Sequence, residues 1–440
     1  MPAQTAHATS AQTPVDCDIL VVGAGLVGAT LALRLQSCGL RVGLLDRGSL
    51  ANDVQTSAFD ARVVALTAQS QELLRGVGAW EEIEASRHCP YLHMRVWEQD
   101  GTGQVEFHAG EIHEPALGTI VENSLLVRAL HRRIRDQVDT AQARGEYPIQ
   151  LYMGRGVEAL EQSLAAARSD SLRPVSRLRC SDGSTLSAHL VIAADGGNSQ
   201  LRQLAGFETR EWDYGQKAIV TTIRTRQAHE RTALQRFLDT GPLAFLPLAD
   251  AADRPLGHHC SIVWSADDAR ADALMALAET DFNAQLSAAM EGALGGVEWS
   301  DTRVVFPLRQ RHAKRYAEGN IVLVGDAAHT IHPLAGQGVN LGFLDVEALA
   351  SELEAGLAAG RLPEDATILS RYQRRRTGNN LAMMGLMEAF KREDTSHDFG
   401  HDIMPMALAQ DTLNVYALPD SDDGNPGYWR DVGTLDAYRL

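Results

Sequence analysis

The sequence predicts an α/β fold, in which one domain alternates buried strands with helices and a second domain is built on a mixed β-sheet. Three short, continuous apolar runs, at 19–22, 190–193 and 321–324, have the length and composition of buried strands. Each is followed within two residues by glycine or aspartate. Between the second and third runs, from 212 to 306, the pattern changes to short runs with apolar alternation, which is typical of a second, mixed sheet.

The first run opens a strand–turn–helix unit with a GxGxxG pattern at Gly23, Gly25 and Gly28. In such a unit the first glycine makes the turn, the second lets the backbone approach a pyrophosphate, and the third lets the helix pack on the strand. A second strand, 41–45, ends at Asp46, about 20 residues further on, where a carboxylate binds ribose hydroxyls. These features predict a Rossmann-like dinucleotide-binding domain and leave FAD and NAD open as the dinucleotide.

The next segments contain fewer chemical signals. Arg62 precedes a predicted helix at 67–74 and faces either the cofactor or solvent. Two runs, 91–96 and 104–108, predict strands of a sheet outside the nucleotide domain. A further amphipathic helix follows, with Ser124 as its predicted N-cap.

The second apolar run leads to an Asp-Gly turn at Asp195. We expect Ser199 and Arg202 on a short helix after this turn. Asp195 is then placed to orient a water molecule or a hydroxyl group, and Arg202 to brace the loop.

The segment 212–306 predicts a mixed sheet that roofs an apolar pocket. Its predicted strands are 218–224, 244–248, 261–264 and 303–306, with one helix at about 266–291. Its histidines, His258 and His259, and the nearby His312 do not have metal-ligand spacing, so surface or capping roles are predicted for them.

The third apolar run ends at Gly325, and Asp326 places a carboxylate where the chain leaves the sheet. Pro333, Gly336 and Gly338 lie in the loop that follows, where the backbone can approach a flat ligand closely. A helix is predicted from 339 to about 357. Its first turn would present unpaired N–H groups to an anionic ligand, such as a reduced isoalloxazine ring.

Composition limits the possible functions. The chain has 440 residues, a net charge of -17 and a pI near 5.3, which argues against general affinity for nucleic acid or anionic lipid. Its 5 cysteines are scattered, which predicts reduced thiols in a cytoplasm. Residues 1–14 are interpreted as a disordered leader, and no apolar run is long enough to cross a bilayer.

Taken together, the three motifs from 16 to 392 resemble the single-component FAD-dependent aromatic hydroxylases, and most closely the ubiquinone-biosynthesis branch. The most specific match is Gly-Asp-Ala-Ala-His-Thr-Ile-His-Pro-Leu-Ala-Gly-Gln-Gly-Val-Asn at 325–340. The resemblance implies a glutathione-reductase-type, para-hydroxybenzoate-hydroxylase-like fold. It also implies a discontinuous FAD-binding domain at 15–90, 119–206 and 317–392, with a substrate domain at 91–118 and 207–316.

The same resemblance assigns roles to residues. Gly23, Gly25, Gly28 and Asp46 would hold the AMP half of FAD, although a glutamate is commoner at the position of Asp46. Asp195 would serve both the FAD pyrophosphate and NAD(P)H, and Asp326 would bind the ribityl chain. The other implied cofactor-binding residues are Arg62, Asn123, Arg128, Gly338, Val339 and Asn340, with Pro333, Gly336 and Gly338 beside the flavin edge.

The implied reaction is hydroxylation of a polyprenylated phenol, with ring carbon C5 favoured by the runs 121–124 and 260–265. NAD(P)H reduces the flavin, O₂ forms a C4a-hydroperoxide, and this transfers one oxygen to the ring. His329 and His332 are candidates for the base, with structural roles as the alternative. The implied protein is cytoplasmic, with possible peripheral membrane or complex association. Alternatives are a flavoprotein reductase on the same fold and a non-catalytic, FAD-holding member of a complex.

The resemblance stops after Arg392. Residues 393–440 are similar instead to a fragment of ADP-glucose pyrophosphorylase, including Asn425-Pro-Gly-Tyr-Trp-Arg-Asp-Val-Gly. The nucleotide-binding half of that fold is missing from the sequence. We interpret this tail as a fused fragment without activity of its own, with an acquired interaction tail as the alternative.

Overall fold

The computed structural model describes residues 15–51, 58–99, 103–163, 173–250, 257–330 and 338–389. The predicted leader at 1–14 and the tail at 393–440 lie outside these residues. The chain divides into one compact unit, Met1–Gln373, and a second, Arg374–Leu440. Because all the candidate site residues fall within the first unit, the description below concerns that unit, and the finer division into two domains stays a prediction.

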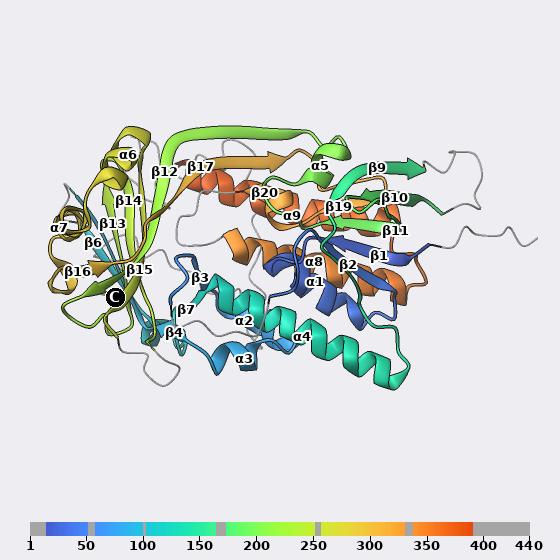
Figure 1. The fold of residues 1–440 in the computed structure, drawn as a ribbon, viewed down its shortest axis with the longest axis horizontal. Helices are drawn as coiled ribbons and strands as arrows, with labels where there is room; N and C mark the ends of the chain where they lie inside the picture. Colours follow the sequence, from blue (N-terminus) through green and yellow to red (C-terminus); the bar gives the residue numbers. More distant parts are fainter. Residues whose placement is uncertain are drawn as a thin grey trace, which may run out of the picture. The chain divides into compact units, whose positions relative to one another are not determined.

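A largely parallel sheet contains the three apolar runs (Figure 1). In order across the sheet, its strands are β18 (Ala317–Glu318), β19 (Ile321–Leu323), β11 (Thr185–Ala193), β1 (Cys17–Val22), β2 (Val42–Asp46) and β8 (Gln150–Met153). β19, β11, β1, β2 and β8 run parallel, whereas β10 (Val175–Cys180) pairs antiparallel with β11, and β9 (Val157–Ser163) pairs antiparallel with β10. Strands of this kind are buried on both faces, which explains why they are continuous apolar runs instead of alternating ones.

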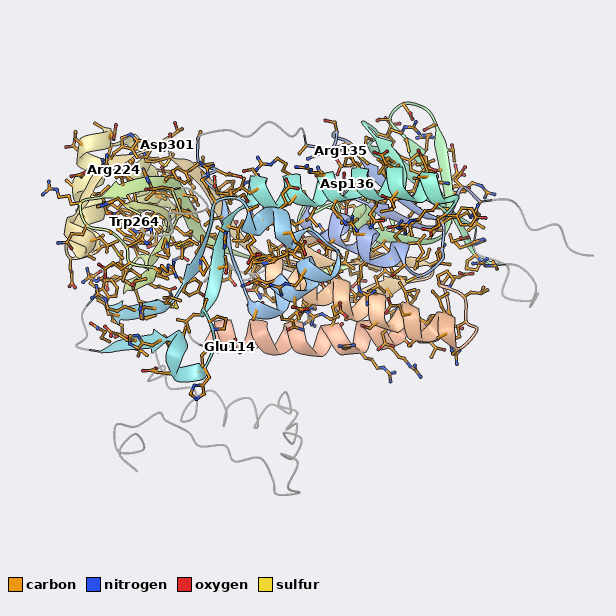
Figure 2. The ribbon with its side chains drawn as sticks, turned by 90° about the horizontal axis from the view of Figure 1, so that it is seen from below. Glu114, Arg135, Asp136, Arg224, Trp264 and Asp301 are labelled. Atoms are coloured by element: carbon orange, nitrogen blue, oxygen red, sulfur yellow. The ribbon has the colours of Figure 1, made fainter. Side chains whose placement is uncertain are left out.

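A mixed sheet forms the second layer. Its order is β20 (His329–Thr330), β17 (Val304–Ala313), β12 (Thr209–Thr225), β15 (His259–Asp267), β14 (Gly241–Pro247), β13 (Thr232–Leu238), β5 (His93–Glu98) and β6 (Gln104–His108), and β16 (Val297–Ser300) pairs with β12. Two helices, α6 (Asp268–Ala276) and α7 (Glu279–Ala289), cover one face and share a core with Trp264. In Figure 2, Trp264 lies within this layer, away from Arg135 and Asp136.

A small antiparallel sheet consists of β3 (Val63–Leu66), β7 (Gly118–Glu122) and β4 (His88–Tyr91), and it shares a core with Leu248 and Ala249 of the mixed-sheet region. The remaining helices are α1 (Leu26–Gln36), α2 (Ala68–Gly76), α3 (Trp80–Glu84), α4 (Asn123–Arg144), α5 (Gln200–Leu204), α8 (Gly338–Ala358) and α9 (Ala366–Ala389), with short 3₁₀ turns η1 (Ala109–Ile112), η2 (Ala293–Gly295) and η3 (Gly325–Ala327). α1 packs on β1 and β2 and against α4 and α8.

Two local predictions were wrong. The single helix expected at 266–291 is two helices, because Leu277 and Ala278 both adopt extended backbone between α6 and α7. Ser124 is not an N-cap, because α4 begins at Asn123 and Glu122 occupies the cap position. The backbone N–H of Ser124 instead donates to the Asp60 carboxylate at 3.0 Å, so a side chain from another loop satisfies this helix end.

Candidate cofactor site

Four neighbouring parallel strands end at one edge of the largely parallel sheet, and each is followed or closed by a predicted motif. The neighbouring strands β19, β11, β1 and β2 can be followed in Figure 1. Their order places Asp326, Asp195, the glycine turn and Asp46 side by side along this edge. Strands lie about 4.8 Å apart, so the outer two of these groups are separated by roughly 14 Å. An edge of this kind, outside the carboxyl ends of parallel strands, is where open α/β sheets bind ligands.

The three glycines of the first turn differ in what surrounds them. Gly23 has φ +107, and a Cβ there would lie 2.3 Å from the carbonyl oxygen of Ala194. A Cβ at Gly28 would lie 1.9 Å from the carbonyl oxygen of Gly23. At Gly25, the N-cap of α1, an added Cβ would meet nothing within 4 Å. The fold itself therefore requires Gly23 and Gly28, whereas Gly25 opens free space in front of the positive end of α1.

Asp46, the last residue of β2, is fixed by two backbone donors. Its Oδ2 accepts the N–H of Ala24 at 2.6 Å, and its Oδ1 accepts the N–H of Gly48 at 2.7 Å. Each carboxylate oxygen can accept a further hydrogen bond. The shorter acid therefore both closes the glycine turn and keeps capacity to bind a ribose hydroxyl.

His131 of α4 braces the same turn, and the sequence analysis missed it. Its Nδ1 accepts the N–H of Ala51 at 2.8 Å, so the ring proton is on Nε2, which donates to the carbonyl of Ala24 at 2.6 Å. Burial lowers the pKa of His131, against the raising effect of the Ala24 carbonyl. A single histidine in an amphipathic helix gives no signal of this role, because both its partners are more than 75 residues away, at separations of 80 and 107.

Arg128 lies one turn before His131 and is 9% exposed. Within the described residues no hydrogen bond or ion pair is recorded for its guanidinium. A buried cation without a counter-ion is costly, so this position favours an anionic ligand such as a phosphate. Asn123, at the start of α4, is half-buried, and its backbone N–H donates to the carbonyl of Arg62 at 2.9 Å. The side chain of Arg62 is exposed.

Asp195 and Arg202 link the second and third motifs. Asp195 Oδ2 accepts the N–H of Leu201 at 3.1 Å, whereas its Oδ1 is buried without a partner in the described structure. Arg202 donates to the carbonyls of Ala327 and Gly197, both at 2.9 Å, which confirms the predicted bracing of this loop. The unsatisfied oxygen of Asp195 is the kind of atom that a bound hydroxyl group or water would pair.

The third motif is tightly packed up to Asp326. Gly325 has φ +57, and a Cβ there would lie 3.0 Å from the Val27 side chain of α1. Asp326 itself is exposed to solvent, yet protein surrounds it closely enough that burial raises its pKa, with His329 lowering and Asp345 raising it further. The carboxylate is therefore open to a ligand hydroxyl on its exposed side.

The first residues of α8 lie at the same edge. The side chain of Asn340 is hydrogen-bonded within the protein. Its Oδ1 accepts from Ser70 Oγ at 2.7 Å and from the Thr67 N–H at 3.2 Å, and its Nδ2 donates to the Ala65 carbonyl at 2.8 Å. One N–H of Nδ2 and the backbone of Asn340 therefore remain for any cofactor contact. Gly338 and Val339 precede it in the same turn. The predicted loop residues Pro333, Gly336 and His332 lie outside the described residues.

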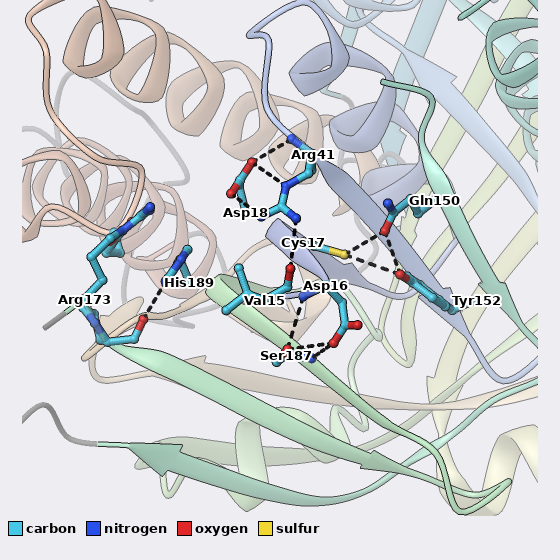
Figure 3. Close-up of polar contacts among 12 residues, drawn as sticks. Val15, Asp16, Cys17, Asp18, Arg41, Gln150, Tyr152, Arg173, Ser187 and His189 are labelled. Carbon is cyan, nitrogen blue, oxygen red and sulfur yellow. Dashed lines mark hydrogen bonds and ion pairs between the residues drawn. The ribbon is translucent and has the colours of Figure 1, made fainter. Parts of the chain in front are cut away.

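At the opposite end of the sheet, polar side chains pair with one another. Asp18 pairs with Arg41 at 3.0 Å, and Tyr152 donates to Gln150 at 2.7 Å (Figure 3). Burial raises the pKa of the nearby Cys17 thiol to about 11, so it stays protonated at neutral pH. Within the described residues, no group of three or more His, Cys, Asp or Glu side chains is placed to hold a metal ion.

A separate hollow of about 700 Å³ is lined by α1, α2, α4 and α8. Its α1 walls are Leu33 to Ser37, at the carboxyl end of that helix. It is therefore at the other end of α1 from Gly25, and it is distinct from the edge described above.

These observations fit an extended dinucleotide. The edge offers open space at Gly25, an uncompensated guanidinium at Arg128, an orphaned oxygen at Asp195 and an accessible carboxylate at Asp326. We propose that the AMP half lies at Asp46 and the glycine turn, the pyrophosphate between α1 and Arg128, and the ribityl chain at Asp326.

Comparison with known proteins identifies the dinucleotide. Residues 16–385 match the family model described as FAD binding domain. The 3-demethoxyubiquinol 3-hydroxylase of Escherichia coli is 36% identical over 85% of this chain and 88% of its own. The ubiquinone hydroxylase UbiL of Rhodospirillum rubrum is 34% identical over 93% and 87%.

Among solved structures, PqsL of Pseudomonas aeruginosa has a TM-score of 0.68 at 21% identity, over 90% of this chain and 99% of its own. The p-nitrophenol 4-monooxygenase PnpA of Pseudomonas putida has a TM-score of 0.61 at 18% identity, over 90% and 97%. These likenesses confirm the predicted fold. With the matched family model and the hydroxylase relatives, they lead to one conclusion: this chain belongs to the FAD-dependent monooxygenases of the ubiquinone-biosynthesis hydroxylase family.

Proposed function

We propose that this protein hydroxylates the aromatic ring of a polyprenylated phenol, at ring carbon C5, with NAD(P)H and O₂ as co-substrates. One atom of O₂ replaces a ring hydrogen as a hydroxyl group, and the other leaves as water with two electrons from NAD(P)H and one proton. The relatives named as ubiquinone-pathway hydroxylases support the pathway. The choice of ring carbon rests on the sequence resemblance.

The observation that supports this substrate most directly is the free face of the mixed sheet. Ile219, Trp264 and Leu243 point to the face that α6 and α7 cover. Their neighbours alternate onto the other face, which carries exposed apolar side chains. These are Val105, Phe107, Phe237, Val304 and Phe306, each at least 37% exposed.

This free face meets the loop before β3. Ser261 on this face donates to the carbonyl of Ala61 at 3.4 Å, and Leu246 packs on the small core that includes Phe59 and Val63. Asn340 in turn joins the end of β3 to the start of α8. A substrate under this face would therefore lie near the start of α8, with an apolar surface available for a prenyl tail.

One polar side chain on the free face lacks a partner. Thr222 pairs in register with Ser261, so its side chain points to the same face. It is 1% exposed, and its Oγ1 has no hydrogen-bond partner in the described structure. At 1% exposure this hydroxyl is enclosed by protein, so we assign it no contact with the substrate.

The bound FAD supplies the oxygen chemistry, and the protein supplies binding and orientation. Asp46, Asp195 and Asp326 would hold the cofactor along the strand ends. The start of α8 would place partial positive charge beside it. The mixed sheet would hold the ring over the cofactor and keep water away from it.

The test is an oxygen-isotope experiment with the purified full chain. We expect bound FAD and, with a short-chain prenylphenol, NAD(P)H and ¹⁸O₂, one ¹⁸O atom in the ring of the product, at C5 by NMR. Label at another ring carbon would contradict only the C5 assignment.

The main alternative is a flavoprotein reductase that reduces the substrate without oxidising its ring. It predicts NAD(P)H consumption stimulated by the prenylphenol, with a reduced product that contains no ¹⁸O. A non-catalytic, FAD-holding role predicts bound FAD that NAD(P)H does not reduce with any phenol. A matched chain ending at Arg392 would show whether the tail changes either result.

No helix in the described residues is long and apolar enough to cross a membrane. We propose that contact with the membrane or with a lipid-carrying complex is peripheral, through the apolar free face of the mixed sheet. Binding of the full chain to neutral lipid vesicles, compared between wild type and Phe107→Ser, tests this proposal. Phe107 is 47% exposed, so its replacement should weaken vesicle binding without affecting stability.

A further inference from the structure

One carboxylate oxygen holds both ends of the segment Gly325–His329. Asp345, in the second turn of α8, accepts the backbone N–H of Gly325 on Oδ2 at 2.8 Å. The same oxygen contacts His329 Nε2 at 2.6 Å. Asp326, the residue proposed to bind the ribityl chain, lies within this closed segment. We call the paired side chains of Asp345 and His329 the clasp.

The clasp is completely enclosed. The side chain of Asp345 is 0% exposed and that of His329 is 1% exposed. The Tyr316 ring stacks on His329 with centroids 5.8 Å apart, and its hydroxyl contacts His312 Nε2 at 3.1 Å. His312 also pairs with His329 in the β17–β20 register. The imidazole of His329 is therefore held on several sides and cannot reach a substrate.

The hydrogen bonds indicate which ring nitrogen of His329 carries the proton. The carboxylate of Asp345 accepts, so Nε2 must be the protonated nitrogen. Nδ1 is buried without a partner in the described structure. The ring thus donates one hydrogen bond, to Asp345, and this bond connects strand β20 to helix α8.

We propose that the clasp is a positioning device for FAD: Asp345 and His329 set the place of Asp326 relative to the start of α8 without touching the cofactor. Asp326 would hold the ribityl chain, and the first turn of α8 would face the flavin ring. The two contacts must keep a fixed separation if one rigid cofactor is to meet both. Asp345 Oδ2 is part of α8 and accepts hydrogen bonds from both Gly325 and His329. This buried oxygen therefore keeps the separation fixed.

The inference rests on FAD binding, which the family establishes, and not on the identity of the substrate. His329 takes the structural role that was the alternative to a catalytic base. A histidine that is 1% exposed and donates to a buried carboxylate acts through Asp326 and α8, and we assign it no contact with reacting atoms.

The experiment compares two polar replacements of one residue. The amide nitrogen of His329→Gln reaches the position of Nε2 and preserves the donor to Asp345, whereas that of His329→Asn falls near Nδ1 and does not. We expect His329→Gln to bind FAD within about 3-fold of wild type and His329→Asn to bind it roughly 10-fold more weakly, the effect of losing one charge-assisted hydrogen bond. The visible spectrum of FAD bound to His329→Asn should also shift.

The matched control is His229, which is also 1% exposed but donates to the carbonyl of Leu248 at 2.9 Å, beside the mixed sheet. His229→Asn should lower the unfolding midpoint of the FAD-free protein and leave the bound-flavin spectrum unchanged. Equal FAD affinity and equal spectra for His329→Gln and His329→Asn would overturn the proposal. If His329→Asn does not fold, Asp345→Asn takes its place, and wild-type FAD affinity and spectrum in that variant would overturn it equally.

Discussion

Two glycines of the first turn should fail in different ways when alanine replaces them. An added Cβ at Gly28 would lie 1.9 Å from the carbonyl oxygen of Gly23, whereas one at Gly25 would meet no protein atom within 4 Å. The first clash involves backbone on both sides, so α1 must move away from the turn. The second methyl group projects into the space in front of α1, where we place the FAD pyrophosphate.

The magnitudes follow from these surroundings. Overpacking lowers the free energy of unfolding by about 1–3 kcal/mol, whereas replacing glycine with alanine in a helix interior raises it by up to about 1 kcal/mol. With a contact as short as 1.9 Å, we expect Gly28→Ala to lower the stability of the FAD-free protein by about 2 kcal/mol, or about 2 °C in Tm for a chain of this length. Gly25→Ala should cost the FAD-free protein less than about 1 kcal/mol, through the weaker N-cap, but reduce FAD affinity between about 10- and 100-fold.

Thermal unfolding of the FAD-free proteins by circular dichroism, and FAD titration by fluorescence quenching, measure the two effects separately. Each variant serves as the control for the other, because both add one methyl group to the same turn. Wild-type FAD affinity in Gly25→Ala would refute the placement of the pyrophosphate at α1. Equal loss of stability in the two variants would refute the packing argument.

Three further predictions concern buried polar groups. Burial lowers the pKa of His312 from an ordinary 6.5 to about 4, so the unfolded chain takes up a proton at a higher pH than the folded chain. The contribution of His312 to the free energy of unfolding is therefore complete above pH 6.5 and falls below it, by about 3 kcal/mol at pH 4. In urea unfolding, wild type should lose stability more steeply on acidification than His312→Gln. Arg128→Met removes a buried cation, so the FAD-free protein should be no less stable while FAD affinity falls at least about 10-fold by fluorescence titration; a large loss of FAD-free stability would contradict this. Asn340→Ala removes three hydrogen bonds and should cost about 2–3 kcal/mol in urea unfolding, against about 1–2 kcal/mol for Ser70→Ala, which removes one of the three and the hydrogen bond from Thr67 Oγ1.

The sequence predicted the parts of the fold that depend on short-range chemistry. The continuous apolar runs predicted β1, β11 and β19 because strands buried on both faces need apolar residues throughout. The predicted helix from 339 to about 357 corresponds to α8, Gly338–Ala358. Predictions were less accurate where ends depend on distant groups: Ser124 does not cap α4, because Asp60 supplies the acceptor from 64 residues away.

The roles of individual residues were decided by the tertiary structure. The pattern of glycines could not show that Gly28 packs against Gly23 while Gly25 faces free space, because this depends on how α1 lies on the turn. Asn340 stays a predicted cofactor-binding residue, and only the structure shows that its side chain also joins β3 and α2, with a partner 275 residues away.

By itself, the sequence determined that three strand ends would carry glycine and aspartate, since strand composition and turn chemistry are local properties. Only the tertiary structure decided that these ends form one row, that His131 supports the first turn and that Asp345 closes the third. The reason is physical: the parallel order of the strands and the burial of each polar side chain are set by contacts between distant segments, and only such contacts determine which donors and acceptors remain for the cofactor.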